Sequence, residues 1–126
     1  MRLASSEVKR LLGRGQRANE SSGGITLSVR ALSSERRREH HSQAGLALAV
    51  PKQHLKRSVD RNRAKRVLRE AFRQHEIRAQ PVDVLLTLSA FPKTLMPAGR
   101  SRAASAHLRA AAEALFRKVI ARQGRQ

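Results

Sequence analysis

Charge and helical periodicity coincide in one segment of this chain, Lys56-Arg57-Ser58-Val59-Asp60-Arg61-Asn62-Arg63-Ala64-Lys65-Arg66-Val67-Leu68-Arg69-Glu70-Ala71-Phe72-Arg73. Eight of these eighteen residues are Lys or Arg. The apolar residues nevertheless recur at i, i+3, i+4, i+7 and i+8, the spacing of one face of an α-helix. They are Ala64, Val67, Leu68, Ala71 and Phe72. The segment predicts a helix that begins near Ser58 or Asp60 and has one face in a protein core.

The opposite face of this predicted helix is cationic. At about 100° per residue, the side chains that project from it are Asn62, Lys65, Arg66, Arg69 and Arg73. A row of positive charges on a rigid element suits a polyphosphate backbone. Charge runs are more commonly solvated faces or disordered tails. Here the apolar stripe and the scarcity of nearby acidic residues favour a docked helix that contacts nucleic acid.

The composition points to the same class of partner. The formal net charge is +18 over 126 residues, so the chain needs a polyanion to offset its self-repulsion. Nucleic acid is the first candidate and an anionic membrane surface the second. No apolar run approaches the ~20 residues that span a bilayer, and the N-terminus lacks a signal-peptide core. Without cysteine there is no disulfide or thiolate metal site. We expect a cytoplasmic protein with one domain over 1–126.

The sequence around the basic segment predicts three strands. Residues 25–30 alternate apolar and polar side chains, which is typical of a half-buried strand. Residues 46–50 form a second apolar strand that Pro51 ends. Residues 82–88 are the most apolar of the three, which favours a central position in the sheet.

Two further helices and several connections complete the predicted organisation. Residues 5–12 predict a short first helix, and 101–122 a final helix. The final helix is expected to bury Leu108, Ala111, Ala112, Leu115, Phe116 and Val119. The polar, glycine-rich stretch 16–24 predicts a turn that can include one short strand. The expected irregular segments are a flexible loop over 33–43, a loop over 91–100 and a tail over 123–126.

This order of elements predicts an α/β (α+β) two-layer sandwich, with helices packed against one small sheet. The basic helix connects the strand over 46–50 to the strand over 82–88. A strand–helix–strand connection is right-handed by default.

The acidic residues do not suggest a catalytic centre. A metal-dependent nuclease needs clustered carboxylates, and the nine acidic residues here are scattered. Asp60 is expected to cap the basic helix, and Glu70 to pair with Arg66 four residues earlier. Asp83 lies within an apolar strand, where an edge position or a cation partner explains it.

The other chemistry-bearing residues point to binding. His40 and His41 lie in an arginine-rich segment without a carboxylate or cysteine at ligand spacing. His54 is expected to contact a phosphate or a base. No glycine-rich phosphate loop and no nucleophile motif is present. These residues predict a binding protein that carries no catalytic residues and no metal of its own.

Aromatic residues are too few for extensive base stacking. Phe72, Phe91 and Phe116 are the only ones, and two of them fall on predicted buried stripes. Arginine is therefore expected to dominate the contacts with structured RNA or DNA. From these residues alone, a structured-RNA binding module, such as a ribosomal protein or assembly factor, and a nonspecific DNA-binding protein both stay open.

The basic segment resembles the bacterial ribonuclease P protein component. The family signature is Arg-Asn-Arg, then a basic pair, then Arg-Glu-x-Phe-Arg, and residues 61–73 match it without a gap. The resemblance extends upstream through 45–50, Lys52 and 55–60. Downstream it includes 83–86 and 115–118. Residues 7–15 fit the family's first helix more loosely, so the resemblance covers most of 3–122.

The resemblance implies a fold similar to the second domain of a small-subunit ribosomal protein. The implied order is α-β-β-β-α-β-α, with a left-handed crossover around the basic helix. It implies a protein subunit of a ribonucleoprotein endonuclease that removes the 5′ leader from precursor tRNA. In the family an RNA subunit with bound magnesium does the chemistry. The protein, expected as one copy per RNA, binds that RNA and the leader and broadens the range of substrates.

The residues implied to contact RNA lie around the signature. They are Lys52, Lys56, Arg57, Arg61, Asn62, Arg63, Lys65, Arg66 and Arg69, and the helical face adds Arg73. Aromatic residues are usual in the family at the position of Val8 and near Gly23 and Gly24, and they are absent here. After the second strand, Pro51, Lys52 and Gln53 replace the family's small residue and paired basic residues. Leader binding is therefore expected to be mostly electrostatic.

Overall fold

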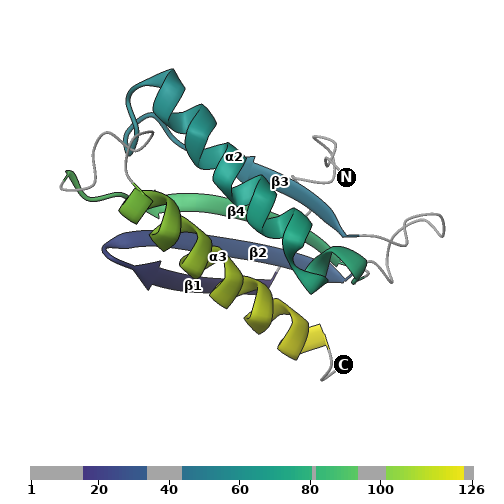
Figure 1. Ribbon diagram of the computed structural model, residues 1–126. Helices are drawn as coiled ribbons and strands as arrows, with labels where there is room; N and C mark the ends of the chain where they lie inside the picture. Colours follow the sequence, from purple (N-terminus) through teal and green to yellow (C-terminus); the bar gives the residue numbers. More distant parts are fainter. Residues whose placement is uncertain (1–15, 34–43, 81, 94–101, 124–126) are drawn as a thin grey trace.

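The protein folds as a four-stranded mixed sheet with two α-helices on one of its faces (Figure 1). The computed structural model describes residues 16–33, 44–80, 82–93 and 102–123. The helix expected over 5–12 and nearly all of the loop expected over 33–43 lie outside these residues. Within them, the arrangement confirms the two-layer α+β prediction.

Most predicted elements are present with small shifts of their ends. The elements are β1 (Gln16–Ser22), β2 (Ile25–Ser33), β3 (Gly45–Ala49), α2 (Ser58–Gln74), the short 3-10 helix η2 (Glu76–Ala79), β4 (Val82–Ala90) and α3 (Arg102–Gln123). The largest change is at β1, a full strand of seven residues where the sequence indicated mainly a turn. The helix η2 was not predicted.

The order of strands in the sheet is β1-β2-β4-β3, which confirms the central position of β4. Strand β2 pairs antiparallel with both β1 and β4, whereas β3 runs parallel to β4. Cross-strand neighbours such as Leu27 and Leu88, or Val29 and Leu86, are buried. The opposite face carries a smaller apolar cluster in which Leu85 packs with Leu32, Ala47 and Ala49.

The connection from β3 through α2 to β4 is left-handed. In Figure 1 both strands point the same way, α2 lies in front of the sheet, and β4 lies to the left of β3 when the strands are turned to point upward. The right-handed default is therefore wrong, and the crossover implied by the family resemblance is correct. The strand pattern supplies the reason: α2 must bury its apolar stripe on the face that carries Leu27, Val29, Leu86 and Leu88.

The two helices form one layer that is joined by aromatic contact. Every stripe residue of α2 predicted to be buried is buried, except Val67, which is partly buried. All six predicted core residues of α3 are also buried. Phe72 of α2 and Phe116 of α3 meet edge to face, with ring centroids 5.8 Å apart at an interplanar angle of 74°. The sheet and this aromatic pair together fix how α2 is rotated about its axis.

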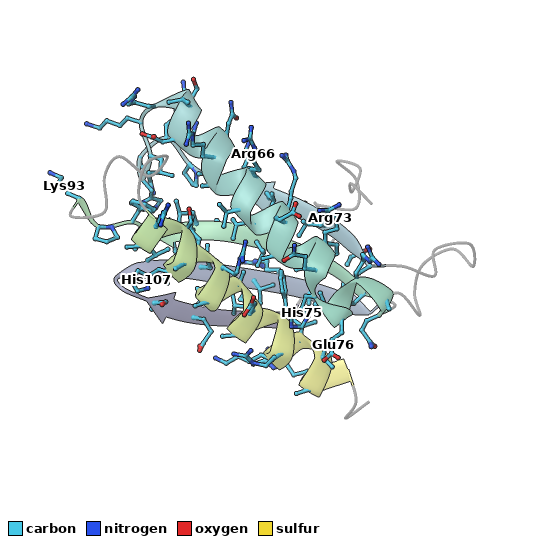
Figure 2. The ribbon with its side chains drawn as sticks, in the orientation of Figure 1. Arg66, Arg73, His75, Glu76, Lys93 and His107 are labelled. Atoms are coloured by element: carbon cyan, nitrogen blue, oxygen red, sulfur yellow. The ribbon has the colours of Figure 1, made fainter. Side chains whose placement is uncertain are left out.

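The turn between β1 and β2 is made by two glycines. Gly23 and Gly24 have φ of 58° and 86°, as a two-residue hairpin loop requires. A Cβ on Gly23 would lie 2.4 Å from the ring of His107. Nδ1 of His107 and the Ser22 hydroxyl are joined by a 2.8 Å hydrogen bond. Figure 2 shows His107 beside the turn. The hairpin is thus held against the start of α3.

Strand β1 lies at the edge of the sheet, where two cations of α3 cover it. Lys118 Nζ donates to the carbonyl oxygen of Asn19 at 3.2 Å, and Arg122 Nη1 donates to that of Arg17 at 2.8 Å. Lys118 also lies 3.4 Å from the Glu20 carboxylate. Covered carbonyl groups cannot pair with the strand of another chain. These contacts stabilise a strand that its polar sequence only weakly indicated.

The expected helix cap at Asp60 and the expected edge position of Asp83 are both wrong. Asp60 does not cap α2, because the helix begins one turn earlier and its N-cap is Arg57, which makes no side-chain cap bond. Asp60 is instead a buried residue of the first turn, where its charge complements the helix dipole. Asp83 is not on an edge strand, because β4 is central, and it is buried with 3% exposure.

His75 links α2 to η2. Its Nδ1 accepts a 3.0 Å hydrogen bond from the backbone N–H of Ile77 and so caps η2, while its ring lies 5.2 Å from that of Phe116. Burial disfavours the charged imidazolium and lowers the pKa of His75 below its ordinary value of 6.5. Glu76 and Glu113 oppose this shift, and Arg117 adds to it.

Replacing Phe72 with Ala should lower the free energy of unfolding by about 3–5 kcal/mol, since it removes a buried aromatic side chain. Phe72→Leu should cost less, because it keeps most of the volume. Replacing both Arg66 and Arg69 with Ala should change stability little, because both side chains are exposed. Urea unfolding would measure all three, and an equal loss in the arginine variant would contradict the assignment of the two faces.

His75 should make stability depend on pH below about 6.5. The unfolded chain binds the proton at a higher pH than the folded chain, so this contribution is complete above 6.5 and is lost as the pH falls. His75→Asn keeps an acceptor at the cap of η2 but cannot titrate. Thermal unfolding should therefore show a smaller loss between pH 7 and pH 5 in this variant than in the wild type. Identical pH profiles would show that His75 does not carry the effect.

Candidate nucleic-acid interface

Helix α2 presents a row of cations to solvent. Arg66, Arg69 and Arg73 are exposed on the side opposite the buried stripe. Figure 2 shows Arg66 and Arg73 projecting from α2 into solvent. Within the described part of the chain, the side chains of Arg66 and Arg69 form no ion pair or hydrogen bond. Their charges are available to a ligand.

Glu70 pairs with Arg73 instead of Arg66. One carboxylate oxygen of Glu70 accepts a hydrogen bond from Arg73 Nη2, and Gln74 approaches the same oxygen at 3.4 Å. The predicted Arg66–Glu70 pair is therefore wrong, because Glu70 turns toward the C-terminal end of the helix. Exposed pairs of this kind contribute little stability, so Arg73 can exchange Glu70 for a phosphate at small cost.

Arg61 has a structural contact that the sequence did not indicate. Its Nη1 donates to the carbonyl oxygens of Leu55 at 2.9 Å and Lys56 at 2.8 Å. The half-buried guanidinium thus binds the turn that precedes α2 to the first turn of the helix. This contact holds the backbone of the turn in which Lys56 and Arg57 are both exposed.

The segment before α2 is a compact turn. The backbone N–H groups of His54 and Leu55 both donate to the carbonyl oxygen of Pro51, at 3.1 and 3.3 Å. Leu55 is fully buried and anchors the turn, whereas Lys52 is exposed. Pro51 therefore places Lys52 near the start of α2. His54 is half-buried, and its Nε2 lies 3.2 Å from Gln53 Nε2.

The remaining predicted contact residues lie along α2. Asn62 and Arg63 are exposed, and Lys65 is half-buried. The side chain of Asn62 makes no hydrogen bond among the described residues, so the structure gives no packing role to this amide. At 100° per residue, Lys65 lies between the exposed Arg69 and the buried Phe72 on the surface of α2. Seven of the ten predicted residues thus lie on α2, a helix roughly 25 Å long, and the other three lie in the turn before it.

Two cations on the opposite face of the sheet were not among the predicted contacts. Arg17 of β1 and Arg30 of β2 are cross-strand partners, and Arg30 is also the partner of Leu85. The alternation of the 25–30 segment could have indicated Arg30, since it occupies a polar position there. All three phenylalanines pack in or against the core on the helix side. No phenylalanine, tyrosine or tryptophan is therefore available for stacking on that face.

The described residues include no arrangement for metal catalysis. No three His, Asp or Glu side chains in them lie close enough together to hold a metal ion. His40 and His41 lie outside the described residues. Neither of the described α-helices is long and apolar enough to cross a membrane. The geometry found on α2 is that of a surface for phosphate groups.

Comparison with known proteins identifies relatives of this chain. The family model described as Ribonuclease P matches residues 3–120. The ribonuclease P protein component of Thioalkalivibrio sulfidiphilus is 36% identical over 80 residues, or 64% of this chain and 59% of that protein. The corresponding protein of Burkholderia pseudomallei is 39% identical over 84 residues, or 66% of this chain and 59% of that protein. The chain thus spans about 59% of the length of these curated relatives.

Solved structures share the fold at low sequence identity. The RNase P protein of Staphylococcus aureus superposes with a TM-score of 0.67 at 18% identity, covering 94% of both chains. The RNase P protein from Thermotoga maritima gives a TM-score of 0.62 at 17% identity, covering 94% of this chain and 96% of that chain. With the family model matching nearly its whole length and the signature helix docked as described, this chain belongs to the ribonuclease P protein family.

Proposed function

We propose that this chain is the protein subunit of ribonuclease P, the ribonucleoprotein that removes the 5′ leader from precursor tRNA. The observation that carries the proposal is the cationic row on a helix whose other side is fully committed to the core. Such a surface binds a phosphate backbone without rearranging. The relatives from Thioalkalivibrio sulfidiphilus and Burkholderia pseudomallei carry the name of that protein component, which supports the same partner.

In this proposal the RNA subunit, with bound magnesium, cleaves the precursor. The residues of this chain supply binding: Arg66, Arg69 and Arg73 contact phosphates of the RNA subunit, and Arg61 holds the preceding turn in place. One protein binds one RNA. The cytoplasm is the proposed location, because the RNA subunit and precursor tRNA are made there in bacteria.

The face of the sheet opposite the helices is the proposed surface for the leader. Arg17 and Arg30 supply charge there, and Leu85 supplies a small apolar patch. Because no aromatic ring is available on that face, leader binding rests on phosphate contacts. Binding of the leader should therefore depend strongly on salt and weakly on base identity.

The decisive experiment adds the purified protein to a bacterial ribonuclease P RNA at low magnesium. Removal of the 5′ leader from precursor tRNA should become faster, because bound cations reduce repulsion between the two RNAs. The protein without the RNA should cleave nothing. RNA binding without any stimulation, at any protein concentration, would instead favour a structured-RNA binding module such as a ribosomal protein or assembly factor.

Replacing both Arg66 and Arg69 with Gln should weaken binding to that RNA and reduce the magnitude of the log–log salt slope by roughly 1.4–1.8, at about 0.7–0.9 per phosphate contact. Arg78→Gln with Lys93→Gln is a matched control, since these exposed cations lie on η2 and after β4, and their loss changes the net charge equally. Fluorescence anisotropy at several salt concentrations would measure both. Equal effects in the two double variants would mean that only net charge matters.

A further inference from the structure

Helix α3 carries a second row of exposed arginines. Arg102, Arg109 and Arg117 are exposed and fall within roughly 80° of arc at 3.6 residues per turn. Within the described residues, none of the three side chains forms a hydrogen bond or a salt bridge. They differ in this from Lys118 and Arg122, whose side chains bind the backbone of β1.

The α3 row runs beside the α2 row in the same direction. Figure 1 shows the two helices side by side on one face of the sheet, and Phe72 and Phe116 mark one level of contact between them. Lys65 precedes Phe72 by seven residues, and Arg109 precedes Phe116 by seven, so the two cations lie at a similar height along their helices. Arg73 and Arg117 each follow a ring by one residue and also lie at a similar height. Two rows of like charge therefore lie next to each other, on helices that pack about 8–10 Å apart.

Among the described residues, few acidic groups neutralise these rows. Glu113 is half-buried within the α3 row and lowers its formal charge from +3 to +2, and Glu70 is engaged by Arg73. Small side chains separate the arginines of α3, because Ala103, Ala106 and Ala110 are exposed. A phosphate backbone can therefore approach α3 closely. Adjacent cation rows repel each other until a polyanion covers them.

We propose that the α3 row is a second phosphate-binding surface, and that α2 and α3 together bind a double-helical segment of RNA. The α2 row contacts one backbone of the duplex and the α3 row the other. The inference rests on the proposed function, in which RNA is the partner of α2, and extends it to α3. A duplex fits better than a single strand, because A-form RNA is recognised by shape and phosphates. Single strands are usually held by stacking on aromatic rings, which this chain keeps in or against its core.

The test measures binding of a short RNA hairpin duplex and of a single strand of equal length. Arg109→Gln with Arg117→Gln should weaken duplex binding roughly fivefold or more and reduce the magnitude of the salt slope by roughly 1.4–1.8. The control Arg78→Gln with Lys93→Gln, which removes the same charge, should change affinity less than about twofold. Glu113→Gln removes the negative charge within the α3 row and should therefore tighten duplex binding. Its control is Glu76→Gln on η2, which removes an exposed negative charge outside the row and should leave duplex binding unchanged.

The outcomes separate this inference from the proposed function. Equal losses in the α3 variant and its control would overturn the α3 surface, as would a Glu113→Gln variant that behaves like Glu76→Gln. An equal loss for single-stranded RNA would overturn the duplex as the partner. Arg117 and Glu113 both act electrostatically on His75, so thermal unfolding is measured to identify a variant that is merely destabilised. If the arginine variant is destabilised, the comparison of Glu113→Gln with Glu76→Gln decides the outcome. If the unmodified protein still stimulates the RNA subunit and Arg66→Gln with Arg69→Gln still weakens binding to it, the proposed function stands although the α3 surface fails.

Discussion

Burial of one side of α2 is the constraint on which the rest of the structure depends. Ala64, Leu68, Ala71 and Phe72 are at most 5% exposed, so the helix cannot rotate without exposing them to water. Charged side chains cannot share that environment without a large desolvation cost. The cations of α2 must therefore face solvent, and the edge-to-face contact of Phe72 with Phe116 ties their direction to α3.

The cations of this protein have two different physical roles. Arg61, Lys118 and Arg122 donate hydrogen bonds to backbone carbonyl groups, and so hold a turn or cover a sheet edge. Arg66 and Arg69 have no such contacts among the described residues. Net charge counts both groups equally, but only the second can bind phosphate without a loss of structure. The +18 charge thus overstates the number of cations that serve binding.

The two faces of the sheet differ in the side chains that they carry. The helix side holds the aromatic side chains, which stabilise the core. The opposite side has polar and basic residues around Leu85 and Leu32. Since the aromatic side chains are committed to packing, the exposed surface offers charge to a ligand, and the planar guanidinium groups of arginine are its main source of directional hydrogen bonds.

Local pattern was enough to predict α2, α3, the three apolar strands and the side of α2 that faces solvent. Periods of 3.6 and 2 residues are properties of neighbouring positions, so Ala64, Leu68 and Leu115 could be assigned from sequence. The contacts of Arg61 and Glu70 were not predictable, because several partners lie within reach of each side chain. The strand β1, the left-handed crossover and the placement of α2 beside α3 depend on segments far apart in the chain. Packing of the apolar faces decided these features, since it determines which segments meet.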